Sequence, residues 1–388
     1  MRLLLVPSSD YLGHPFPQRY NHIFERLADF HEVHVARFKL YRSPARHTRT
    51  IVHDLPGQGY GGLAAYYGEY AIPHALELRR IVANERIDVV ILSNLSAPFG
   101  YMVLRGGSCR NVPVVFDLQD YFPSAARYLT GPDSGVSNLL EYPLESMQSY
   151  LLGNSDEVVA ASRALSAYAS SRTRKNVTYI PNGISDYFLS PPRENIRREE
   201  LGLVEGSLVL GFVGSVEFWF DFDPIIESVK KLVKLGVPIS VLLVGGRLRS
   251  NYSESVKKHI VDQGLKSNFF FTGFVDQREV PSFIRLMDIC VAPFRTSDKA
   301  AFYAGPNKIW EYLSQNKPVF ITPISDAFLN RGFLTLVSTA DDYVQRILQF
   351  VHDATPFLSK TALGQDEARK MTWENSSQLY IQLLESLR

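Results

Sequence analysis

Short apolar runs recur along the chain, and each is followed by a longer segment in which apolar residues return at helical spacing. This alternation is typical of βαβ units, in which helices connect the strands of a parallel sheet. A first series predicts strands near residues 3–6, 32–36, 88–92, 112–116, 157–160 and 177–180, with helices such as 18–28, 75–84 and 138–152 between them.

A second series begins after a break in the pattern at residues 188–207. The break contains Leu189-Ser190-Pro191-Pro192-Arg193-Glu194, whose charges and paired prolines are typical of an exposed connection between domains. Beyond it the pattern predicts strands near 208–213, 239–244, 268–272, 288–292 and 318–321, with helices at 224–233, 253–263, 279–286 and 307–314.

The two series together predict an α/β chain with two Rossmann-like domains. The first domain covers residues 1–187, a linker covers 188–207 and the second domain covers 208–367. Residues 368–388 form a final helical segment. Because no strand follows this segment, it can cap either domain.

Length and charge agree with this division and limit the classes of partner. A chain of 388 residues exceeds what one hydrophobic core usually supports. Its 45% hydrophobic and 21% charged residues are ordinary for a globular protein. The net charge of +1, from 41 basic and 40 acidic residues, provides no overall field for a nucleic acid, so we predict no nucleic-acid partner.

Cysteine usage and hydropathy indicate a compartment. Cys109 and Cys290 lie in separate halves near apolar runs, which favours reduced structural thiols in a cytoplasm over a disulfide framework or a metal cluster. The apolar start of the chain is too short for a signal peptide and predicts a buried strand. Polar residues and Pro98 interrupt the longest apolar stretch, 89–104, so we predict no membrane-spanning helix.

The residues that directly follow the predicted strands are the candidates for ligand binding, because open parallel sheets bind ligands beyond the carboxyl ends of their strands. Glycine there lets backbone amides approach a ligand, and a following helix N-terminus attracts phosphate, although any single glycine fits a tight turn equally well. In the first half these residues are Gly13-His14, Ser93-Asn94, Asp117-Leu118-Gln119-Asp120, Ser162 and Asn182-Gly183, and in the second half Gly214-Ser215, Gly245-Gly246-Arg247, Gly273-Phe274 and Pro293-Phe294.

Several common catalytic motifs are absent from the sequence. It lacks GxGxxG and GxxxxGK[ST], which weakens the dehydrogenase and ATPase hypotheses, and it lacks HExxH, CxxC and GxSxG. The acidic pair in Asp221-Phe222-Asp223 has spacing that suits a divalent metal. However, Asp223 precedes Pro224 at a predicted helix start, so we interpret it as the N-cap and predict no metal site.

Several sequence blocks together carry a resemblance to a known family. The first blocks are Ala161-Ser162, Tyr179-Ile180-Pro181-Asn182-Gly183-Ile184 and Leu210-Gly211-Phe212-Val213-Gly214-Ser215. Further blocks are Leu243-Val244-Gly245-Gly246, Phe271-Thr272-Gly273-Phe274-Val275, Asp288-Ile289-Cys290-Val291-Ala292-Pro293, Asn307-Lys308-Ile309-Trp310-Glu311-Tyr312-Leu313 and Lys317-Pro318-Val319. In their order and spacing over most of the chain, these blocks resemble the GT-B nucleotide-sugar glycosyltransferases, and within them the retaining family-four type.

The resemblance implies two domains that face each other across a cleft, with the sugar nucleotide bound mainly by the second and a C-terminal helix that crosses back to the first. Glu311 matches the last Glu of the family's E-x7-E motif, which accepts hydrogen bonds from the donor ribose. Lys308, or else Arg247, would oppose the charge of the diphosphate. The predicted donor-binding residues are Gly214, Ser215, Gly246, Arg247, Phe274, Val275, Gly305, Asn307, Lys308 and Glu311.

The chain departs from the family at two places near the donor. Tyr303 stands eight residues before Glu311, where the family usually has its other Glu. The basic residues that commonly follow the Gly214 strand are replaced by Glu217-Phe218-Trp219-Phe220-Asp221, a variant that resembles a bacterial and archaeal subset of the family.

The resemblance also implies an acceptor site in the first domain, with Gly13, His14, Arg19, Asp117 and Asp120 as its predicted residues. The Gly13-His14 loop matches one that closes over the diphosphate and the acceptor. Asp120 lies where a polar pair ends a family strand, and it either orients a sugar or caps the next segment. We predict His14, Asp120 and Lys308 as the catalytic residues.

The sequence therefore predicts a metal-independent glycosyltransferase without a cofactor, which moves a hexosyl group from a UDP- or GDP-sugar to a hydroxyl of a glycan or lipid-linked saccharide with retention. A GT-B-fold epimerase and a non-catalytic nucleotide-sugar or glycan-binding subunit are the alternatives. A basic cluster in the first domain predicts peripheral contact with the anionic inner face of a membrane, or else forms a solvated loop. It comprises Arg37, Lys39, Arg42, Arg46 and Arg49.

Overall fold

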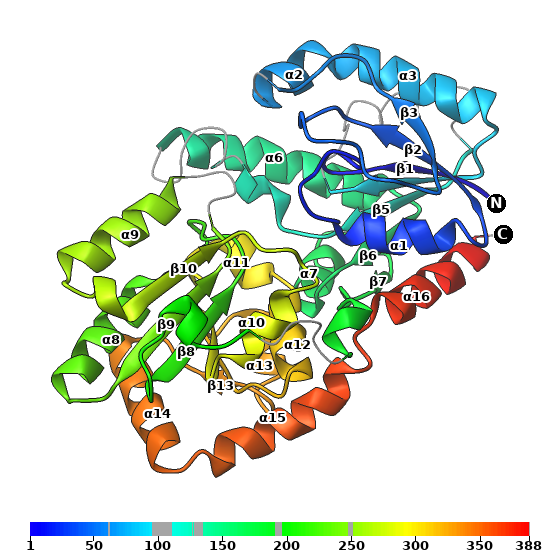
Figure 1. Cartoon of the computed structure of the whole chain (residues 1–388). Helices are drawn as coiled ribbons and strands as arrows, with labels where there is room; N and C mark the ends of the chain where they lie inside the picture. The colour runs from blue at the N-terminus through cyan, green and yellow to red at the C-terminus, as the bar shows by residue number, and fades with distance from the viewer. Residues whose placement is uncertain are drawn as a thin grey trace. The chain divides into compact units, whose positions relative to one another are not determined.

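The computed structural model describes residues 1–60, 63–94, 111–125, 127, 135–190, 196–246 and 251–387. The chain forms two compact units (Figure 1). Unit 1 contains Met1–Gly183 together with Trp373–Arg388, and unit 2 contains Ile184–Thr372. The described residues of the expected linker, 188–207, group with unit 2.

Unit 1 contains a seven-stranded sheet with the order β3-β2-β1-β4-β5-β6-β7. Each neighbouring pair is parallel. The order reverses direction between β1 and β4. The strands are β1 (Arg2–Val6), β2 (Glu32–Arg37), β3 (Ile51–Asp54), β4 (Val89–Ser93), β5 (Val114–Leu118), β6 (Glu157–Ala160) and β7 (Val177–Tyr179).

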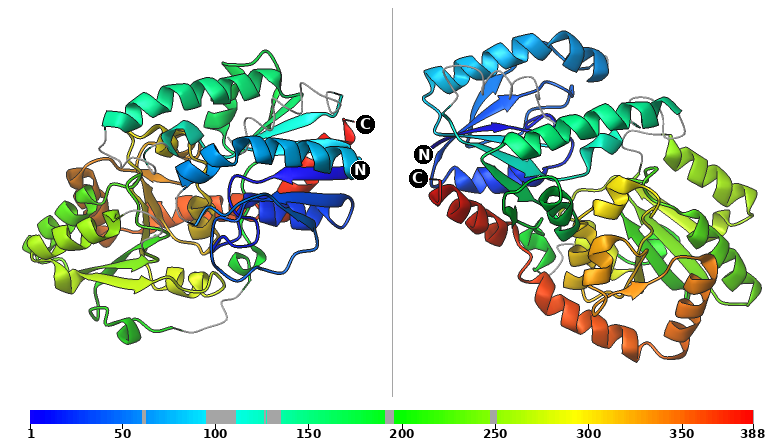
Figure 2. Two further views of the ribbon diagram at one scale, coloured as in Figure 1. Left: turned by 90° about the horizontal axis from the view of Figure 1, so that it is seen from above. Right: turned by 180° about the vertical axis from the view of Figure 1, so that it is seen from behind.

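The helices of unit 1 lie on both faces of this sheet, and two of them pack together although they are far apart in the sequence (Figures 1 and 2). These are α1 (Arg19–Leu27) and the C-terminal α16 (Trp373–Glu385). In α1 the apolar residues Tyr20, Ile23, Phe24 and Leu27 recur on one face and are buried. The other helices are α2 (Leu63–Glu69), α3 (Ala71–Asn84), η1 (Phe122–Ala125), α6 (Gly135–Asn154) and α7 (Arg163–Ser170).

Unit 2 contains a six-stranded parallel sheet with the order β10-β9-β8-β11-β12-β13, which reverses direction between β8 and β11. Its strands are β8 (Leu208–Val213), β9 (Ile239–Val244), β10 (Phe269–Gly273), β11 (Ile289–Ala292), β12 (Val319–Ile321) and β13 (Thr335–Leu336). Its helices are η2 (Asp186–Phe188), η3 (Glu199–Leu201), α8 (Asp223–Lys234), α9 (Tyr252–Asp262), η4 (Lys266–Asn268), α10 (Val280–Arg285), α11 (Lys299–Tyr303), α12 (Asn307–Ser314), α13 (Ser325–Leu329), α14 (Ala340–His352) and α15 (Thr355–Ala368).

The predicted fold class is confirmed, because each unit is a parallel sheet with connecting helices. One local prediction is wrong by a residue: α8 begins with Asp223 itself and Phe222 is its N-cap. The Asp223 carboxylate contacts His259 at 3.0 Å instead of capping the helix. Within the described residues, none of the helices has the length and apolar character that crossing a bilayer requires.

The prediction that the two cysteines are reduced structural thiols can be checked for Cys290. Cys290 is a free, buried thiol in β11, and burial raises its pKa. Cys109 lies outside the described residues.

Candidate functional site

Three strand ends of unit 2 meet backbone to backbone at the carboxyl edge of its sheet. The N–H of Gly245, after β9, donates to the carbonyl oxygen of Gly273 at 2.9 Å. A Cβ atom on Gly245 would lie 2.2 Å from the carbonyl oxygen of Gly214, which follows β8. Both Gly214 and Gly245 have positive φ, at +132° and +124°, so this edge requires glycine for space and for conformation.

The start of α12 supplies the polar groups at this edge. Its N-cap, Pro306, provides no side-chain cap, so the N–H groups of Asn307 and Lys308 can bind an anion, whereas that of Ile309 donates to the carbonyl oxygen of Pro306 at 3.4 Å. Lys308 lies in the first turn, and its Nζ would be 3.3 Å from a Cβ atom on Gly214. Glu311 lies three residues later on the same helical face. The side-chain oxygen of Asn307 is buried and has no hydrogen-bond partner in the described part of the chain.

Burial shifts both charged groups of this helix toward neutrality. It lowers the pKa of Lys308 to about 7, although the charge of Glu311 opposes part of the shift. Burial likewise raises the pKa of Glu311 to about 7, and Lys308 opposes that shift. A bound anion at Lys308, or hydroxyl donors at Glu311, would restore the charge that burial disfavours.

The other predicted donor residues occupy the same edge. Ser215 follows β8, and Gly246 follows β9. A Cβ atom on Gly246 would lie 4.0 Å from the ring of Phe274, which follows β10 and is 48% exposed. Val275 is half-buried beside Phe274, and Gly305 directly precedes Pro306. Arg247 lies outside the described residues.

Tyr303, the residue at the position of the family's other Glu, is the last residue of α11. The side chain of Asp298 caps this helix by accepting from the N–H groups of Ala300 at 2.8 Å and Ala301 at 3.3 Å. The ring of Tyr303 packs edge-on against Phe302 with centroids 5.3 Å apart. Tyr303 therefore ends α11, and residues 304–306 connect it to α12.

In unit 1 a buried carboxylate that the sequence analysis missed, Asp10, organises the Gly13-His14 loop. Asp10 accepts hydrogen bonds from the N–H of Gly13 at 2.9 Å, the N–H of Leu40 at 3.1 Å and Nε of Arg37 at 2.8 Å. Burial alone would raise its pKa, but Arg37 and the two N–H groups hold that pKa below its usual value. A Cβ atom on Gly13 would lie 2.6 Å from Oδ2 of Asp10, so the turn requires glycine.

His14 is buried beside this turn. Its Nδ1 lies 2.8 Å from the carbonyl oxygen of Phe16 and 3.1 Å from Nε2 of Gln18, and these contacts fix the orientation of the ring. The backbone carbonyl of His14 accepts a hydrogen bond from Arg46 at 2.5 Å. The loop is therefore held by its own side chains before any ligand binds.

Arg19 and Asp117 form an internal network that joins the ends of α1, β5 and β7. Nε of Arg19 lies 3.5 Å from Oδ2 of Asp117, and Nη1 donates to the carbonyl oxygen of Pro181 at 2.9 Å and to Asn182 at 3.0 Å. Nε2 of Gln119 donates to the same Asp117 oxygen at 3.0 Å. Both members of the pair are buried, so they act as scaffold for the edge.

Asp120 differs from Asp117 because the residue as a whole is exposed. Its N–H donates to Oδ1 of Asn94 at 3.2 Å, which orients the turn after β5. Protein atoms that crowd the carboxyl group raise its pKa, and the charge of Arg19 opposes this shift. Of the two carboxylates after and within β5, Asp120 belongs to the more exposed residue.

The acidic side chains that sequence spacing offers to a metal have other partners. Asp221 lies 3.8 Å from Arg295, and Asp223 contacts His259. Over the ranges of chain that the structure describes, no group of three or more His, Cys, Asp or Glu side chains suits a metal ion.

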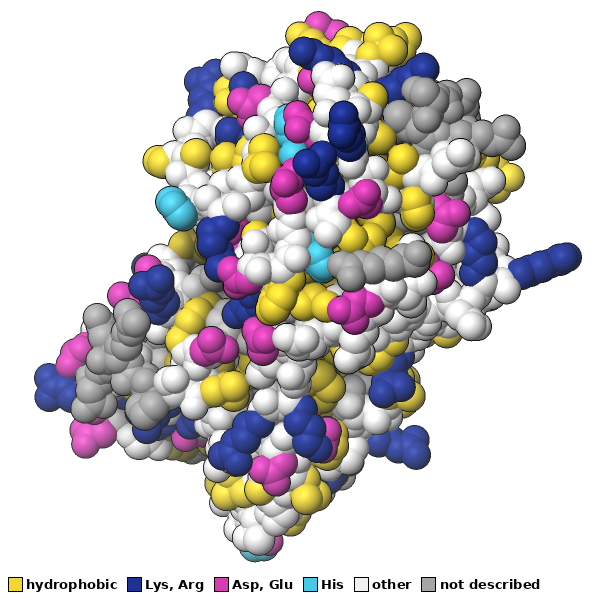
Figure 3. Space-filling model, turned by 90° about the vertical axis from the view of Figure 1, so that its right-hand side faces the viewer, with side chains coloured by type: hydrophobic (Ala, Val, Ile, Leu, Met, Phe, Trp, Pro, Cys, Tyr) yellow, Lys and Arg dark blue, Asp and Glu magenta, His cyan; other side chains and the backbone are white. Residues whose placement is uncertain are grey.

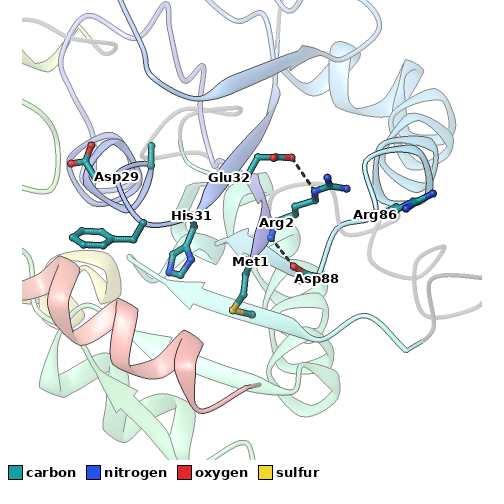
Figure 4. Close-up of a pocket in the computed structure, with 9 residues that line it drawn as sticks. Met1, Arg2, Asp29, His31, Glu32, Arg86 and Asp88 are labelled. Carbon is teal, nitrogen blue, oxygen red and sulfur yellow. Dashed lines mark hydrogen bonds and ion pairs between the residues drawn. The ribbon is translucent and has the colours of Figure 1, made fainter.

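A cavity of about 690 Å³ lies at the other end of the unit 1 sheet (Figure 4). Its lining includes Arg2, Glu32 and Asp88, from the starts of β1 and β2 and the residue before β4. Arg2 contacts Glu32 at 3.1 Å, and its N–H donates to Asp88 at 2.7 Å. None of the predicted site residues lines this cavity, so the site is defined by the carboxyl edges of the sheets.

The fold and these edges match known protein families. Residues 21–186 match the model described as Glycosyltransferase Family 4, and residues 207–353 match the model described as Glycosyl transferases group 1. The two halves of the chain are therefore each similar to glycosyltransferases, and its two parallel-sheet units have the GT-B fold.

Two curated relatives are similar in sequence. "Putative teichuronic acid biosynthesis glycosyltransferase TuaH" of Bacillus subtilis (strain 168) is 27% identical over 53% of this chain and 49% of its own length. The 2-deoxystreptamine glucosyltransferase of Streptomyces kanamyceticus is 23% identical over 66% of this chain and 64% of its own length. The matches thus span about half to two thirds of the relatives' lengths.

Two solved structures show the same fold over the whole chain. Sucrose-phosphate synthase of Thermosynechococcus elongatus has a TM-score of 0.77 at 16% identity, with 100% of each chain covered. Anabaena HepE in complex with UDP-glucose has a TM-score of 0.73 at 15% identity, also with 100% of each chain covered.

Proposed function

We propose that this protein transfers a hexosyl group from a nucleoside-diphosphate sugar to a hydroxyl of a glycan or lipid-linked saccharide. The observation that carries the proposal is the start of α12, where an uncapped helix N-terminus, Lys308 and Glu311 lie together beside Gly214. This arrangement offers hydrogen-bond donors and a cation for a diphosphate, and a carboxylate for ribose hydroxyls. The matches to two glycosyltransferase family models support the same chemistry.

The donor is better supported than the acceptor. HepE, which shares the fold, has been solved with UDP and with UDP-glucose, so a UDP-sugar is the first donor to test. The names of the two relatives mention different molecules, teichuronic acid and 2-deoxystreptamine. We propose a glycan or lipid-linked acceptor that binds at the unit 1 edge, where Gly13, His14 and Asp120 would contact it and the buried Arg19 and Asp117 would hold the edge in place.

The proposed reaction retains the anomeric configuration and needs no metal. As the glycosidic bond breaks, negative charge develops on the leaving diphosphate, and Lys308 with the first-turn amides of α12 would stabilise it. Asp221 and Asp223 already contact Arg295 and His259, which supports metal independence. Asp120 and His14 would orient the acceptor hydroxyl.

The test is the release of nucleoside diphosphate from a panel of UDP- and GDP-sugars, with and without saccharide acceptors. A transferase releases one nucleoside diphosphate for each glycosylated product that it forms. An epimerase would convert the donor without any acceptor, and a binding subunit would bind the nucleotide without turnover. Activity should survive EDTA. Loss of turnover that magnesium or manganese restores would overturn metal independence.

The basic cluster that suggested a membrane contact is largely engaged within unit 1. Lys39 pairs with Asp54 at 2.8 Å, Arg49 pairs with Asp29 at 2.5 Å, and Arg42 lies over the ring of Tyr60. Figure 3 shows Lys and Arg side chains interspersed with Asp and Glu on the face in view. These contacts favour an ordered surface loop. A peripheral location at the inner membrane face remains a proposal, and equal flotation with neutral and anionic liposomes would contradict it.

A further inference from the structure

The segment that replaces the family's basic residues after β8 contacts the cation on α12. Nζ of Lys308 lies 4.0 Å from the ring centroid of Phe220 in this segment, 4.2 Å from that of Phe212 in β8 and 5.6 Å from that of Phe294 after β11. The three rings also pack on one another, with centroids 5.0 Å apart for Phe212–Phe220 and 4.8 Å apart for Phe220–Phe294. We call these three rings the aromatic cage.

An aromatic cage positions an ammonium group without neutralising it. Ring faces attract a cation through their quadrupole, whereas a carboxylate would cancel the charge that an incoming anion needs. Within the described ranges no carboxylate oxygen lies within 4.0 Å of Lys308 Nζ. Among the described residues, Glu311 is the one charged group that shifts the pKa of Lys308. The cage therefore holds the amine in place without a counter-ion at contact distance, and a bound diphosphate would favour its charged form.

Backbone hydrogen bonds hold the segment that contains Phe220 against the segment that follows β11. Nε of Arg295 donates to the carbonyl oxygen of Phe218 at 3.0 Å. The backbone N–H of Arg295 donates to the carbonyl oxygen of Trp219 at 2.7 Å. The N–H of Asp221 donates to the carbonyl oxygen of Pro293 at 2.7 Å. The residues before and after Phe220 are thus both hydrogen-bonded to the segment that follows β11. Phe220 itself is buried, with 3% of its surface exposed. Its ring does not depend on a ligand for its place.

We propose that Phe220, with Phe212 and Phe294, is a positioning residue that holds the Lys308 ammonium at the end of β8 for the diphosphate of the donor. The aromatic segment then replaces the missing basic residues indirectly, because it fixes a cation that comes from α12. This inference rests on the proposed function, since it assumes a nucleoside diphosphate at this edge.

The experiment is a double-mutant cycle of Phe220→Leu and Lys308→Met, with calorimetric affinities for UDP, GDP and the free nucleosides. Phe220→Leu should weaken diphosphate binding about tenfold, as expected for loss of a buried cation–π contact, and leave nucleoside binding unchanged. In the Lys308→Met background the same substitution should have no further effect. Phe222→Leu is the matched control, because Phe222 is buried in the same aromatic cluster but does not contact Lys308.

The possible results separate the inference from the proposed function. If the wild-type protein binds neither diphosphate, the proposed function fails. If it binds but Phe220→Leu weakens nucleoside and diphosphate equally, or retains its effect without Lys308, the positioning role is wrong. Should Phe220→Leu fail to fold, Phe294→Leu replaces it and should give a smaller loss, since its ring is farther from Nζ. An equal loss in Phe222→Leu would also overturn the inference.

Discussion

At the scale of single residues, Glu311 is the side chain whose removal should affect the nucleotide most directly. Hydrogen bonds to a charged group contribute about 1.5 to 3 kcal/mol each, so Glu311→Ala should weaken nucleoside-diphosphate affinity by about one to three orders of magnitude. Calorimetric titration measures this loss. The control is Glu254→Ala, an exposed change in the first turn of α9. Unchanged affinity in Glu311→Ala would show that the ribose is bound elsewhere.

The pKa values of Lys308 and Glu311 predict how binding depends on pH. Both lie at about 7 in the free protein. Above this value Lys308 loses its charge, so diphosphate affinity should fall. Below it Glu311 gains a proton, so the contact with ribose should weaken. We therefore expect an affinity maximum near neutral pH.

Two substitutions test which group causes the fall in affinity at high pH and which causes it at low pH. Lys308→Arg stays charged and should flatten the alkaline limb, although its planar fork will not reproduce the contacts of an ammonium. Glu311→Gln cannot titrate and should flatten the part of the acid limb that does not come from the diphosphate itself. An alkaline limb that is unchanged in Lys308→Arg would assign the titration to another group.

Sequence reasoning identified Glu311 through its match to the family's motif, and Lys308 because helical spacing places it on the same face as Glu311. It could not identify the aromatic cage, since Phe212 lies in β8, Phe220 in the segment after β8 and Phe294 after β11, and these parts meet only in the folded sheet. Asp10 was missed for a related reason: its partners Arg37 and Leu40 lie 27 and 30 residues away. In the sequence, a polar residue after the first strand carries no signal of burial.

At the scale of elements, the glycine edge of unit 2 predicts an unequal effect of two glycine substitutions. Gly236→Ala places a side chain at positive φ with no atom within 4 Å, so it should cost about 1 kcal/mol of unfolding free energy. Gly245→Ala adds a clash with the backbone of Gly214 and should cost at least about 2 to 3 kcal/mol. Urea unfolding compares the two. Equal losses would show that the close approach of β8 and β9 is easily relaxed.

The pattern of apolar runs predicted most strands of both sheets but not β3 or β13. Ile51–Asp54 contains only two apolar residues, and none of its four residues is buried, because β3 is an edge strand. Thr335–Leu336 is a two-residue edge strand of the other sheet. The edge strands β7 and β10 were predicted, because each lies in a longer apolar run; β3 and β13 were missed because they are short and contain few apolar residues.

At the scale of the whole molecule, unit 1 is assembled from two distant parts of the chain. Trp373 of α16 stacks on His22 of α1 with ring centroids 4.5 Å apart, and burial lowers the pKa of His22 to about 4. Tyr380 packs edge-on against Phe24 at 5.4 Å. The sequence pattern left open which domain the final helix covers, because its apolar face fits either core. The family resemblance indicated a return to the first domain.

This arrangement predicts that unit 1 depends on residues beyond Thr372. Trp373, Tyr380 and Leu384 are almost fully buried in the core that also contains Ile23 and Phe24. Loss of one buried aromatic side chain costs about 3 to 5 kcal/mol, and a typical domain is stable by only about 5 to 15 kcal/mol. A chain that ends at Thr372 should therefore leave unit 1 unfolded at room temperature, while unit 2 retains its complete sheet.

Hydrogen exchange resolves the two units in one measurement. In the chain that ends at Thr372, amides of β1 and α1 should exchange without protection, whereas those of β8 and β9 should stay protected. A chain that ends at Glu385 is the matched control, because it keeps all three buried side chains and should behave like the full chain. If β1 and α1 remain protected without α16, the first unit is stable by itself and the helix only covers it. Refolding of unit 1 on addition of a peptide of residues 373–388 would show that burial of the helix, and not its covalent connection, stabilises the unit.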